Sequence, residues 1–375
     1  MTWSNWQHLA TFRSATLYDL SAAAFNGKLV VVATKTAGRG LTRGDFGLAL
    51  ADSRNDISDV PQGNFLFLAP RIAFDRQGAL HLFWGETAPA TQIAGAVGLL
   101  PVSTIWHSVH QPSGNWSQPQ QVYASKRHLY WNADYAEVVT IDGVPHAIIA
   151  DFDFPFALVH ITMQGTKATV ERVPTYVAAY TTITETTKSP GILVGYMAAD
   201  TVRPAVGNSV FARRRTVSGW SDATRIQRST DGGATSVHIR KAGSGVVHAI
   251  WAQSHSDGLA PDGWRTAYSR DDGQTWSAPH TTARAEDGLS SFRVQSYPSS
   301  CLRVFYLAGK SMMRPLMHHW MLADSSWQSG ATLPLANGLT IVTAADDSAL
   351  FVVELGPGPQ DPTAGVLSFV VGRQP

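Results

Sequence analysis

The chain has 375 residues, of which 29 are basic and 28 are acidic, and charged residues make up only 15% of it. This balance gives no extended field for nucleic acid or an anionic membrane, so neither is expected as a partner. With 32 glycines, 20 prolines and 10% aromatic residues, the composition favours many short strands joined by turns over long helices.

The first residues, Met1 to His8, lack a basic segment followed by an apolar core, and no apolar run is long enough to span a membrane. A cytoplasmic location is therefore expected. The single cysteine, Cys301, lies in an apolar run and is expected to be a small buried side chain. We expect a monomer or weak dimer without a cofactor.

Turns that carry a tryptophan recur along the chain, at intervals of about 54 residues or about twice that. Halving the long intervals predicts two eroded turns, at 53–57 and 164–168, and makes seven turns in all. The turns with tryptophan are, in chain order, Ser4–Trp6, Ser113–Trp116, Ser218–Trp220, Ser269–Trp276 and Asp324–Trp327.

A second repeat gives the same count, because pairs of apolar runs joined by a Gly or Asp turn also occur seven times. They are Ala22–Ala33, Ile72–Trp84, Glu137–Ile149, Thr182–Tyr196, Val237–Trp251, Val294–Tyr306 and Ile341–Glu354. Together the repeats predict an all-β, seven-bladed propeller of four-stranded antiparallel blades, with residues 1–375 as one domain. We expect residues 1–12 to supply the outer strand of the last blade, which removes a free sheet edge.

Three histidines recur at one position of the second strand, as His81, His146 and His248. Each follows a glycine turn by three residues. A residue type that repeats from blade to blade is expected to belong to the scaffold, so these histidines are not placed in the site.

The best-preserved turn reads Ser269-Arg270-Asp271-Asp272-Gly273-Gln274-Thr275-Trp276. In such a hairpin, Ser and Asp side chains bond backbone amides, Gly supplies a positive φ and Trp fills the space between hairpin and sheet. The segment resembles the Asp-box (BNR repeat) of the sialidase-like β-propeller superfamily. The blade count is closer to seven-bladed propellers of the polysaccharide-lyase type than to six-bladed sialidases.

The site of a propeller is expected where the innermost strands begin around the axis. Aligning the strand pairs on their turns gives seven axial positions, of which three are basic and four apolar. They are Leu20, Arg71, Ala136, Ile183, His238, Arg293 and Ile341. Arg71, His238 and Arg293 are therefore candidate catalytic residues.

The ends of the second strands are expected beside these positions and add further candidates. Trp84, Tyr196, Trp251 and Tyr306 are candidate substrate-binding rings, and two residues beyond such ends lie Glu86 and the candidate catalytic residue Asp151. Rings with guanidinium groups suit an amphipathic, acidic ligand. The competing interpretation places the rings between blades and the arginines on a solvated rim.

Connecting loops contribute four more substrate-binding candidates, Tyr130, Trp131, Asp134 and Arg265. The insert from Gly85 to Thr104 is expected to be a mobile cover of the axis. Asp151 and Asp153 are too few ligands for a calcium loop, so no metal is expected.

The resemblance implies two kinds of chemistry. Sialidases bind a carboxylate with three arginines. Pro70-Arg71-Ile72-Ala73 is similar to the first arginine motif and Arg293 to a later one. The third is not assignable in this sequence, and Arg265 and Arg203 are the candidates for it. This sequence offers no Tyr and Glu pair for the sialidase nucleophile. A lyase resemblance implies that Arg71 and Arg293 hold a uronate, with His238 as base and a tyrosine as acid.

The sequence thus favours an enzyme with one asymmetric axial site for an acidic sugar, of glycosidase or lyase type. One alternative is an intracellular tailoring enzyme or cyclase that acts on a small apolar molecule. A second alternative is a propeller that binds a sugar or a protein without catalysis.

Overall fold

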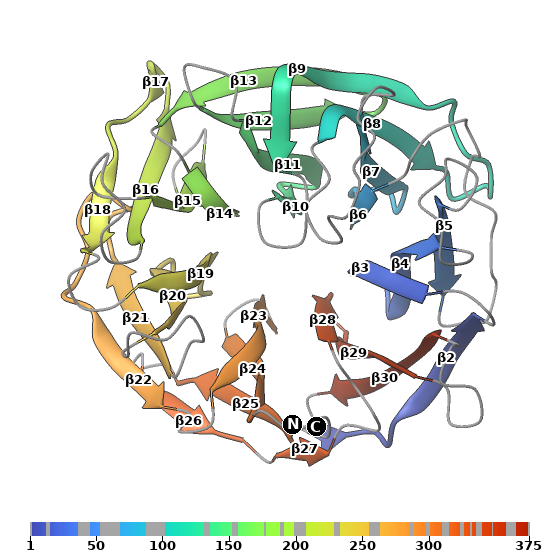
Figure 1. Cartoon of the computed structure of the whole chain (residues 1–375). Coiled ribbons are helices and arrows are strands. Elements are labelled where there is room, and N and C mark those ends of the chain that lie inside the picture. Colours follow the sequence, from blue (N-terminus) through green and yellow to red (C-terminus); the bar gives the residue numbers. More distant parts are fainter. Residues whose placement is uncertain are drawn as a thin grey trace.

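The elements that the structure describes are β-strands, arranged as seven radial sheets around a central axis (Figure 1). This computed structural model confirms the predicted all-β seven-bladed propeller. The described residues are 2–12, 16–36, 46–52, 68–87, 102–130, 136–151, 157–175, 178–187, 191–198, 208–228, 233–254, 263–284, 288–297, 301–309, 315–322, 326–330, 332–334, 340–346, 348–357 and 365–373.

The first three blades follow each other in chain order. Blade 1 contains β3 (Thr16–Phe25), β4 (Lys28–Thr36) and β5 (Phe46–Asp52). Blade 2 contains β6 (Leu68–Phe74), β7 (Leu80–Thr87), β8 (Val102–His110) and β9 (Gln120–Tyr130). Blade 3 contains β10 (Ala136–Ile141), β11 (Val144–Asp151), β12 (Ala157–Gln164) and β13 (Lys167–Pro174). A short β9–β11 pairing joins blades 2 and 3 into one sheet.

The next three blades repeat this order from the axis outward. Blade 4 contains β14 (Ala178–Glu185), β15 (Ile192–Ala198), β16 (Ser209–Thr216), β17 (Gly219–Trp220) and β18 (Thr224–Gln227). Blade 5 contains β19 (Ala234–Lys241), β20 (Val247–Gln253), β21 (Gly263–Ser269) and β22 (His280–Arg284). Blade 6 contains β23 (Leu289–Ser296), β24 (Leu302–Ala308), β25 (Pro315–Met321), β26 (Trp327–Ser329) and β27 (Leu333–Pro334).

Blade 7 combines both ends of the described chain. It contains β28 (Thr340–Ala345), β29 (Leu350–Pro357) and β30 (Gly365–Arg373), and its outer edge is formed by β1 (Thr2–Trp3) and β2 (Gln7–Phe12), both paired with β30. Between these two strands, Ser4 and Val371 exchange two hydrogen bonds of 2.9 and 3.0 Å. The expectation that the N-terminal segment closes the ring is confirmed.

The apolar cores lie between adjacent blades. One core, for example, brings Val30 and Val32 of blade 1 against Leu82 and Trp84 of blade 2. Strand residues alternate between the two faces of a blade, and each face packs on a different neighbour. Large side chains of the second strands therefore pack in the cores between blades.

The hairpin at 269–276 has the internal bonds expected of it. Ser269 Oγ donates to Asp271 Oδ1 (2.8 Å) and accepts the Gly273 N–H (2.8 Å), and Asp271 accepts the Thr275 N–H (2.8 Å). Gly273 has φ +83° and Trp276 packs against the core between blades 4 and 5. The prediction of a structural turn is confirmed.

Two of the three recurring histidines of the second strand belong to buried pairs, and the third, His248, lies against the ring of Tyr268. His81 Nδ1 lies 2.9 Å from His107 Nε2, and His146 Nδ1 lies 2.9 Å from His160 Nε2. Burial lowers the pKa of His107 and His146 to about 3, with a further contribution from the partner ring. These pairs are neutral parts of the scaffold, as the repetition predicted.

Deleting residues 1–12 should destabilise the protein strongly, because it removes β1 and β2 and leaves β30 with an open edge. A point variant perturbs the same contact less. Leu9 is 2% exposed, and the substitution Leu9→Ala should lower the unfolding free energy by about 2 to 5 kcal/mol. Chemical denaturation measures both. Unchanged unfolding of the truncated chain would contradict the closure role.

Acid should destabilise the fold between pH 6.5 and 4. Buried histidines have pKa values lowered to about 3 or 4 in the folded chain, so only the unfolded chain gains protons in this window and stability falls as pH falls. Each such histidine lowers the unfolding free energy by up to about 2 kcal/mol at pH 5. The five with the lowest values in the second and third strands are His107, His146, His160, His248 and His318.

The measurement is the melting temperature from pH 7 to pH 5. His107→Gln should flatten its decline, whereas the change of an exposed histidine, His8→Gln, should leave the slope as it is. A melting temperature that is constant over this range would rule out the buried neutral pairs as the acid-sensitive element.

Candidate functional site

A cavity of about 870 Å³ lies on the propeller axis and is lined by the innermost strands of all seven blades. These strands are β3, β6, β10, β14, β19, β23 and β28. They surround the axis side by side and run in the same direction, since each begins its blade (Figure 1). The cavity is of the size that ligand-binding pockets have.

One layer of side chains around this axis can be defined by hydrogen-bond register. Its members face equivalent residues of the second strands, in the pairs Ser21↔Val32, Arg71↔Phe83, Glu137↔Ile148, Thr182↔Gly195, His238↔Ile250, Arg293↔Phe305 and Val342↔Val353. We call these seven first-strand residues the axial layer.

The predicted axial positions agree with this layer at Arg71, His238 and Arg293 and are wrong by one residue in the other four blades. The reason is turn length. The three correct blades join their first two strands through five residues each, at 75–79, 242–246 and 297–301. The other turns, at 26–27, 142–143, 186–191 and 346–349, are shorter or longer.

A shift of one residue moves a side chain to the opposite face of a strand. The layer therefore contains Ser21, Glu137, Thr182 and Val342 where the sequence alignment placed Leu20, Ala136, Ile183 and Ile341. The site is more polar than the sequence indicated, because the Glu137 carboxylate and the Ser21 hydroxyl line the cavity beside the three basic residues.

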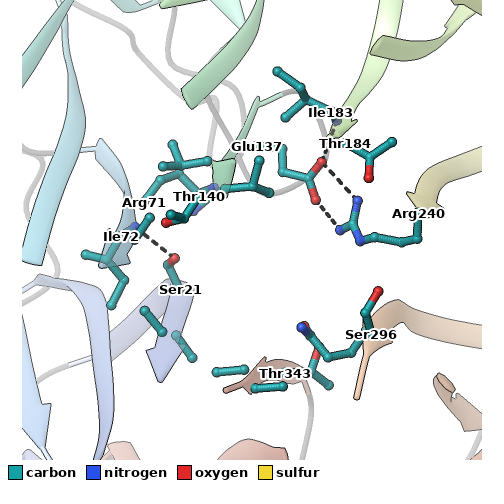
Figure 2. A pocket seen from close by; sticks show the side chains of 18 of the residues that line it. Ser21, Arg71, Ile72, Glu137, Thr140, Ile183, Thr184, Arg240, Ser296 and Thr343 are labelled. Atoms are coloured by element: carbon teal, nitrogen blue, oxygen red, sulfur yellow. Dashed lines mark hydrogen bonds and ion pairs between the residues drawn. The ribbon is translucent and has the colours of Figure 1, made fainter. Parts of the chain in front are cut away.

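Three members of the layer accept a backbone N–H from the next blade. Ser21 Oγ accepts from Ile72 (3.2 Å), as Figure 2 shows. Glu137 Oε2 accepts from Ile183 (2.8 Å) and Thr182 Oγ1 accepts from Ile239 (3.2 Å). In each case the donor is the residue that follows the layer residue of the next blade.

Two further members donate to a backbone carbonyl of the next blade. Arg71 Nε donates to Ala136 O (3.3 Å), and its Nη1 donates to Pro70 O (2.7 Å). His238 Nε2 lies 3.3 Å from Phe292 O. A carbonyl can only accept, so Nε2 carries the proton of His238 and Nδ1 has the lone pair.

His238 is neutral near pH 7. Burial lowers its pKa to about 3, and the positive charges of Arg240 and Arg293 lower it further against the opposing effect of Glu137. Its Nδ1 is buried and has no hydrogen-bond partner among the described residues. Nδ1 therefore keeps its lone pair, and the pKa of about 3 makes the ring a weak base near pH 7.

Arg293 lies in blade 6, directly beside His238, and its Nη1 donates to Phe292 O (2.8 Å). Arg71 lies in blade 2, separated from blades 5 and 6 by two intervening blades on either side. The structure thus brings all three basic candidates to one cavity, with Arg71 across the axis from the other two.

A partly buried ion pair crosses the cavity wall between blades 3 and 5 (Figure 2). Arg240 Nη2 bonds Glu137 Oε1, Arg240 Nη1 bonds Thr182 Oγ1 (3.0 Å), and Thr182 donates to Glu137 Oε2 (2.8 Å). Burial alone would raise the pKa of Glu137, but Arg240 and the Ile183 N–H bring it below the usual value. Glu137 is therefore an anion held by its neighbours.

The other carboxylates that line the cavity are also engaged. Glu185 pairs with Lys241 at 2.8 Å. Asp75 accepts the backbone N–H groups of its own turn, and Asp346 accepts from Gly27 (2.6 Å) and its own turn.

The aromatic candidates do not line the cavity, which corrects their predicted placement. Trp84 and Trp251 are fully buried, and Tyr196 and Tyr306 are 3% exposed. All four pack in the cores between blades. The competing interpretation of the rings holds because the end of a second strand faces the neighbouring blade rather than the axis.

Glu86 and Asp151 are also placed away from the cavity. Glu86 accepts from Trp106 Nε1 (2.7 Å) in its own blade. Asp151 accepts from Ser125 Oγ (2.8 Å) and the Tyr123 hydroxyl in the outer strand of blade 2, and from Arg172 (3.1 Å). Both carboxylates fix strands to one another, which corrects their predicted position on the axis.

Arg265 lies on β21, the third strand of blade 5, and donates to Thr281 Oγ1 (3.3 Å) outside the cavity. Tyr130 ends β9 and pairs with Ala150 through its backbone. Trp131, Asp134, Asp153 and Arg203 and most of the insert 85–104 lie outside the described residues.

The sequence reading missed three cavity residues that the structure reveals, namely Glu137, Arg240 and Tyr180. Arg240 follows His238 by two residues and therefore shares its strand face, a signal that was present in the sequence. Tyr180 lies in a β-bulge of β14 with φ +52°. Such bulges cannot be recognised from the apolar pattern alone.

In the described part of the chain, no three His, Cys, Asp or Glu side chains gather closely enough to hold a metal ion. A search of the same residues for a membrane-spanning helix gives none.

The fold is shared with solved structures of low sequence identity. A family PL25 polysaccharide lyase, an ulvan lyase bound to -[GlcA(1-4)Rha3S]-, superimposes with a TM-score of 0.63 at 12% identity, covering 96% of this chain and 95% of that one. A protein of unknown function from Dyadobacter fermentans superimposes with a TM-score of 0.56 at 11% identity, covering 98% of this chain and 99% of that one.

A GH93 α-L-arabinofuranosidase of Fusarium graminearum in complex with arabinobiose gives a TM-score of 0.51 at 13% identity, with 84% and 95% covered. No protein-family model and no curated sequence matches the chain. The seven-bladed fold is thus similar to that of sugar-active propellers, and these identities establish the fold alone.

Removing one member of the Glu137–Arg240 pair should cost about 3 kcal/mol of unfolding free energy, because the other charge stays buried without compensation. Glu137→Gln should cost less than Glu137→Ala, since the amide still accepts from Ile183. The double variant Glu137→Gln/Arg240→Met completes a mutant cycle in urea denaturation. Strictly additive effects would show that the two side chains are not coupled.

Proposed function

We propose that the chain binds an acidic saccharide in the axial cavity and cleaves it by β-elimination. The observation that carries the proposal is the common level of Arg71, His238 and Arg293 in one cavity. Guanidinium groups on two sides of the cavity suit a carboxylate. The imidazole of His238 is neutral, and its Nδ1 carries the lone pair that would take a proton.

In the proposed step, His238 Nδ1 takes the proton on the carbon next to the uronate carboxylate. The electron pair of that C–H bond forms a C=C bond, the C–O bond to the neighbouring sugar breaks with its pair on oxygen, and this oxygen takes a proton. Arg293 and Arg71 stabilise the charge that develops on the carboxylate. Tyr180, a tyrosine of the cavity wall, is the proposed proton donor.

Elimination has better support than hydrolysis. The four carboxylates of the cavity wall are engaged in ion pairs or in turns, whereas hydrolysis would need two of them as acid and base or nucleophile. The polysaccharide lyase with the similar fold was solved with a uronic acid in its saccharide, which supports the same ligand class.

A non-catalytic sugar-binding propeller is the second candidate. It is favoured by the use of Arg71 and His238 as bridges to the next blade, a role that needs no chemistry. A tailoring enzyme for an apolar molecule has less support, because the aromatic side chains expected to hold such a substrate pack between blades.

Arg293→Ala should lower kcat/KM on uronate oligosaccharides by about 100-fold, the loss of roughly 3 kcal/mol of charge-assisted bonding in the transition state. Turnover is followed by the ultraviolet absorbance of the new C=C bond conjugated to the carboxylate, and binding by calorimetry. Arg265→Ala is the matched control outside the cavity and should retain full activity.

Each outcome separates the candidates. Binding that depends on Arg293 without turnover would establish the second candidate and refute elimination. A chain that neither binds nor cleaves uronates, while its melting temperature shows that it is folded, would refute both.

A further inference from the structure

Strands β16, β17 and β18 form the outer part of blade 4, far from the axis (Figure 1). The segment that contains them carries a strip of arginines. The segment 208–228 contains Arg213, Arg214, Arg215, Arg225 and Arg228 but a single acid, Asp222, although the whole chain has a net charge of only +1. Such a segregated charge is not a consequence of composition. It makes this edge strongly basic compared with the rest of the chain.

The register of β16 and β18 sets the shape of the strip. Phe211 pairs with Arg225, so Arg213 and Arg215, two and four residues further on, point to the same face as Arg225. Arg228 follows β18 and lies beside the start of β16, whereas Arg215 lies near its end. The strip therefore follows the length of β16, about 20 Å at 3.3 Å per residue.

Some of these guanidinium groups have partners within the chain, and two of the arginines are exposed. Arg215 pairs with Glu171 of blade 3 at 2.7 Å, and Arg213 Nη1 donates to Ser221 O (2.6 Å). The Nε atoms of Arg213 and Arg214 have no hydrogen-bond partner among the described residues. Arg225 and Arg228 are exposed to solvent.

The strip has a defined orientation relative to the innermost strands. Strands β14, β15 and β16 are successively antiparallel, so β16 begins on the same face of the ring as β14 and the other innermost strands. Arg228 is at this end. The strip therefore runs in the same sense as the innermost strands, with Arg228 at the end where these strands begin.

We propose that this strip is a second binding surface for an acidic polysaccharide, and that it holds the polymer while one unit occupies the axial cavity. The inference rests on the proposed function for its ligand class. Nucleic acid is disfavoured, because the aromatic rings of the strip, Phe211 and Trp220, pack into the core between blades 3 and 4 and offer no platform for stacking bases.

The test compares binding of polygalacturonate and heparin, as polyanionic probes, with neutral dextran and single-stranded DNA. Arg225→Glu/Arg228→Glu should weaken binding of the polyanionic polysaccharides on the order of tenfold and reduce its salt dependence. The matched control, Lys126→Glu/Arg373→Glu, reverses two exposed charges on blades 2 and 7 and should bind like the unchanged protein.

Unchanged polysaccharide binding by the Arg225/Arg228 variant would overturn the proposal, as would equal losses in both double variants or tighter binding of DNA than of polysaccharide. Failure of the axial site is distinguishable, because Arg293→Ala then leaves polymer retention intact. Failure of the strip alone leaves polymer binding unchanged in the Arg225/Arg228 variant, while Arg293→Ala still weakens the binding of monomeric glucuronate.

Discussion

Each innermost strand of the ring pairs with one neighbour only and turns its other edge toward the axis, and this constraint governs the site. A buried N–H group without a partner is costly, and an open sheet edge invites foreign pairing. Residues of the axial layer provide such partners, since Ser21, Glu137 and Thr182 accept N–H groups of the next blade. Polar side chains on the axis are therefore required by the architecture before any ligand is considered.

The same positions then decide which chemistry the cavity offers. An acceptor such as Thr182 and a donor such as His238 both bridge neighbouring blades, but only the histidine keeps a second, basic nitrogen. A hydrogen bond to Phe292 O fixes the imidazole in one tautomer, and burial keeps it neutral. A structural bond from Nε2 and a lone pair on Nδ1 are compatible in this side chain, because they use different ring nitrogens.

The repeat in the sequence was sufficient for the blade count, the closure by residues 1–12 and the role of the hairpin at 269–276. Side-chain direction at the axis was predictable only where turns have equal length, as for Arg71, His238 and Arg293; turns of other lengths displaced the prediction by one residue and concealed Glu137. Aromatic residues such as Trp84 were misplaced, because apolar rings suit a binding site and an interface between blades equally well.

The hairpin at 269–276, which lies away from the axis, contacts the chain next to an innermost strand. Asp272 of the Asp-box hairpin accepts the Thr187 N–H (2.8 Å) and hydroxyl (2.7 Å), which fixes the chain just after β14. Strand β14 carries Thr182 and Ile183, the two residues that hold the Glu137 carboxylate against Arg240. The hairpin thus contributes to the position of the axial charges without touching them. A displaced β14 would move Thr182 and Ile183, the two β14 residues that donate to Glu137, at the same time.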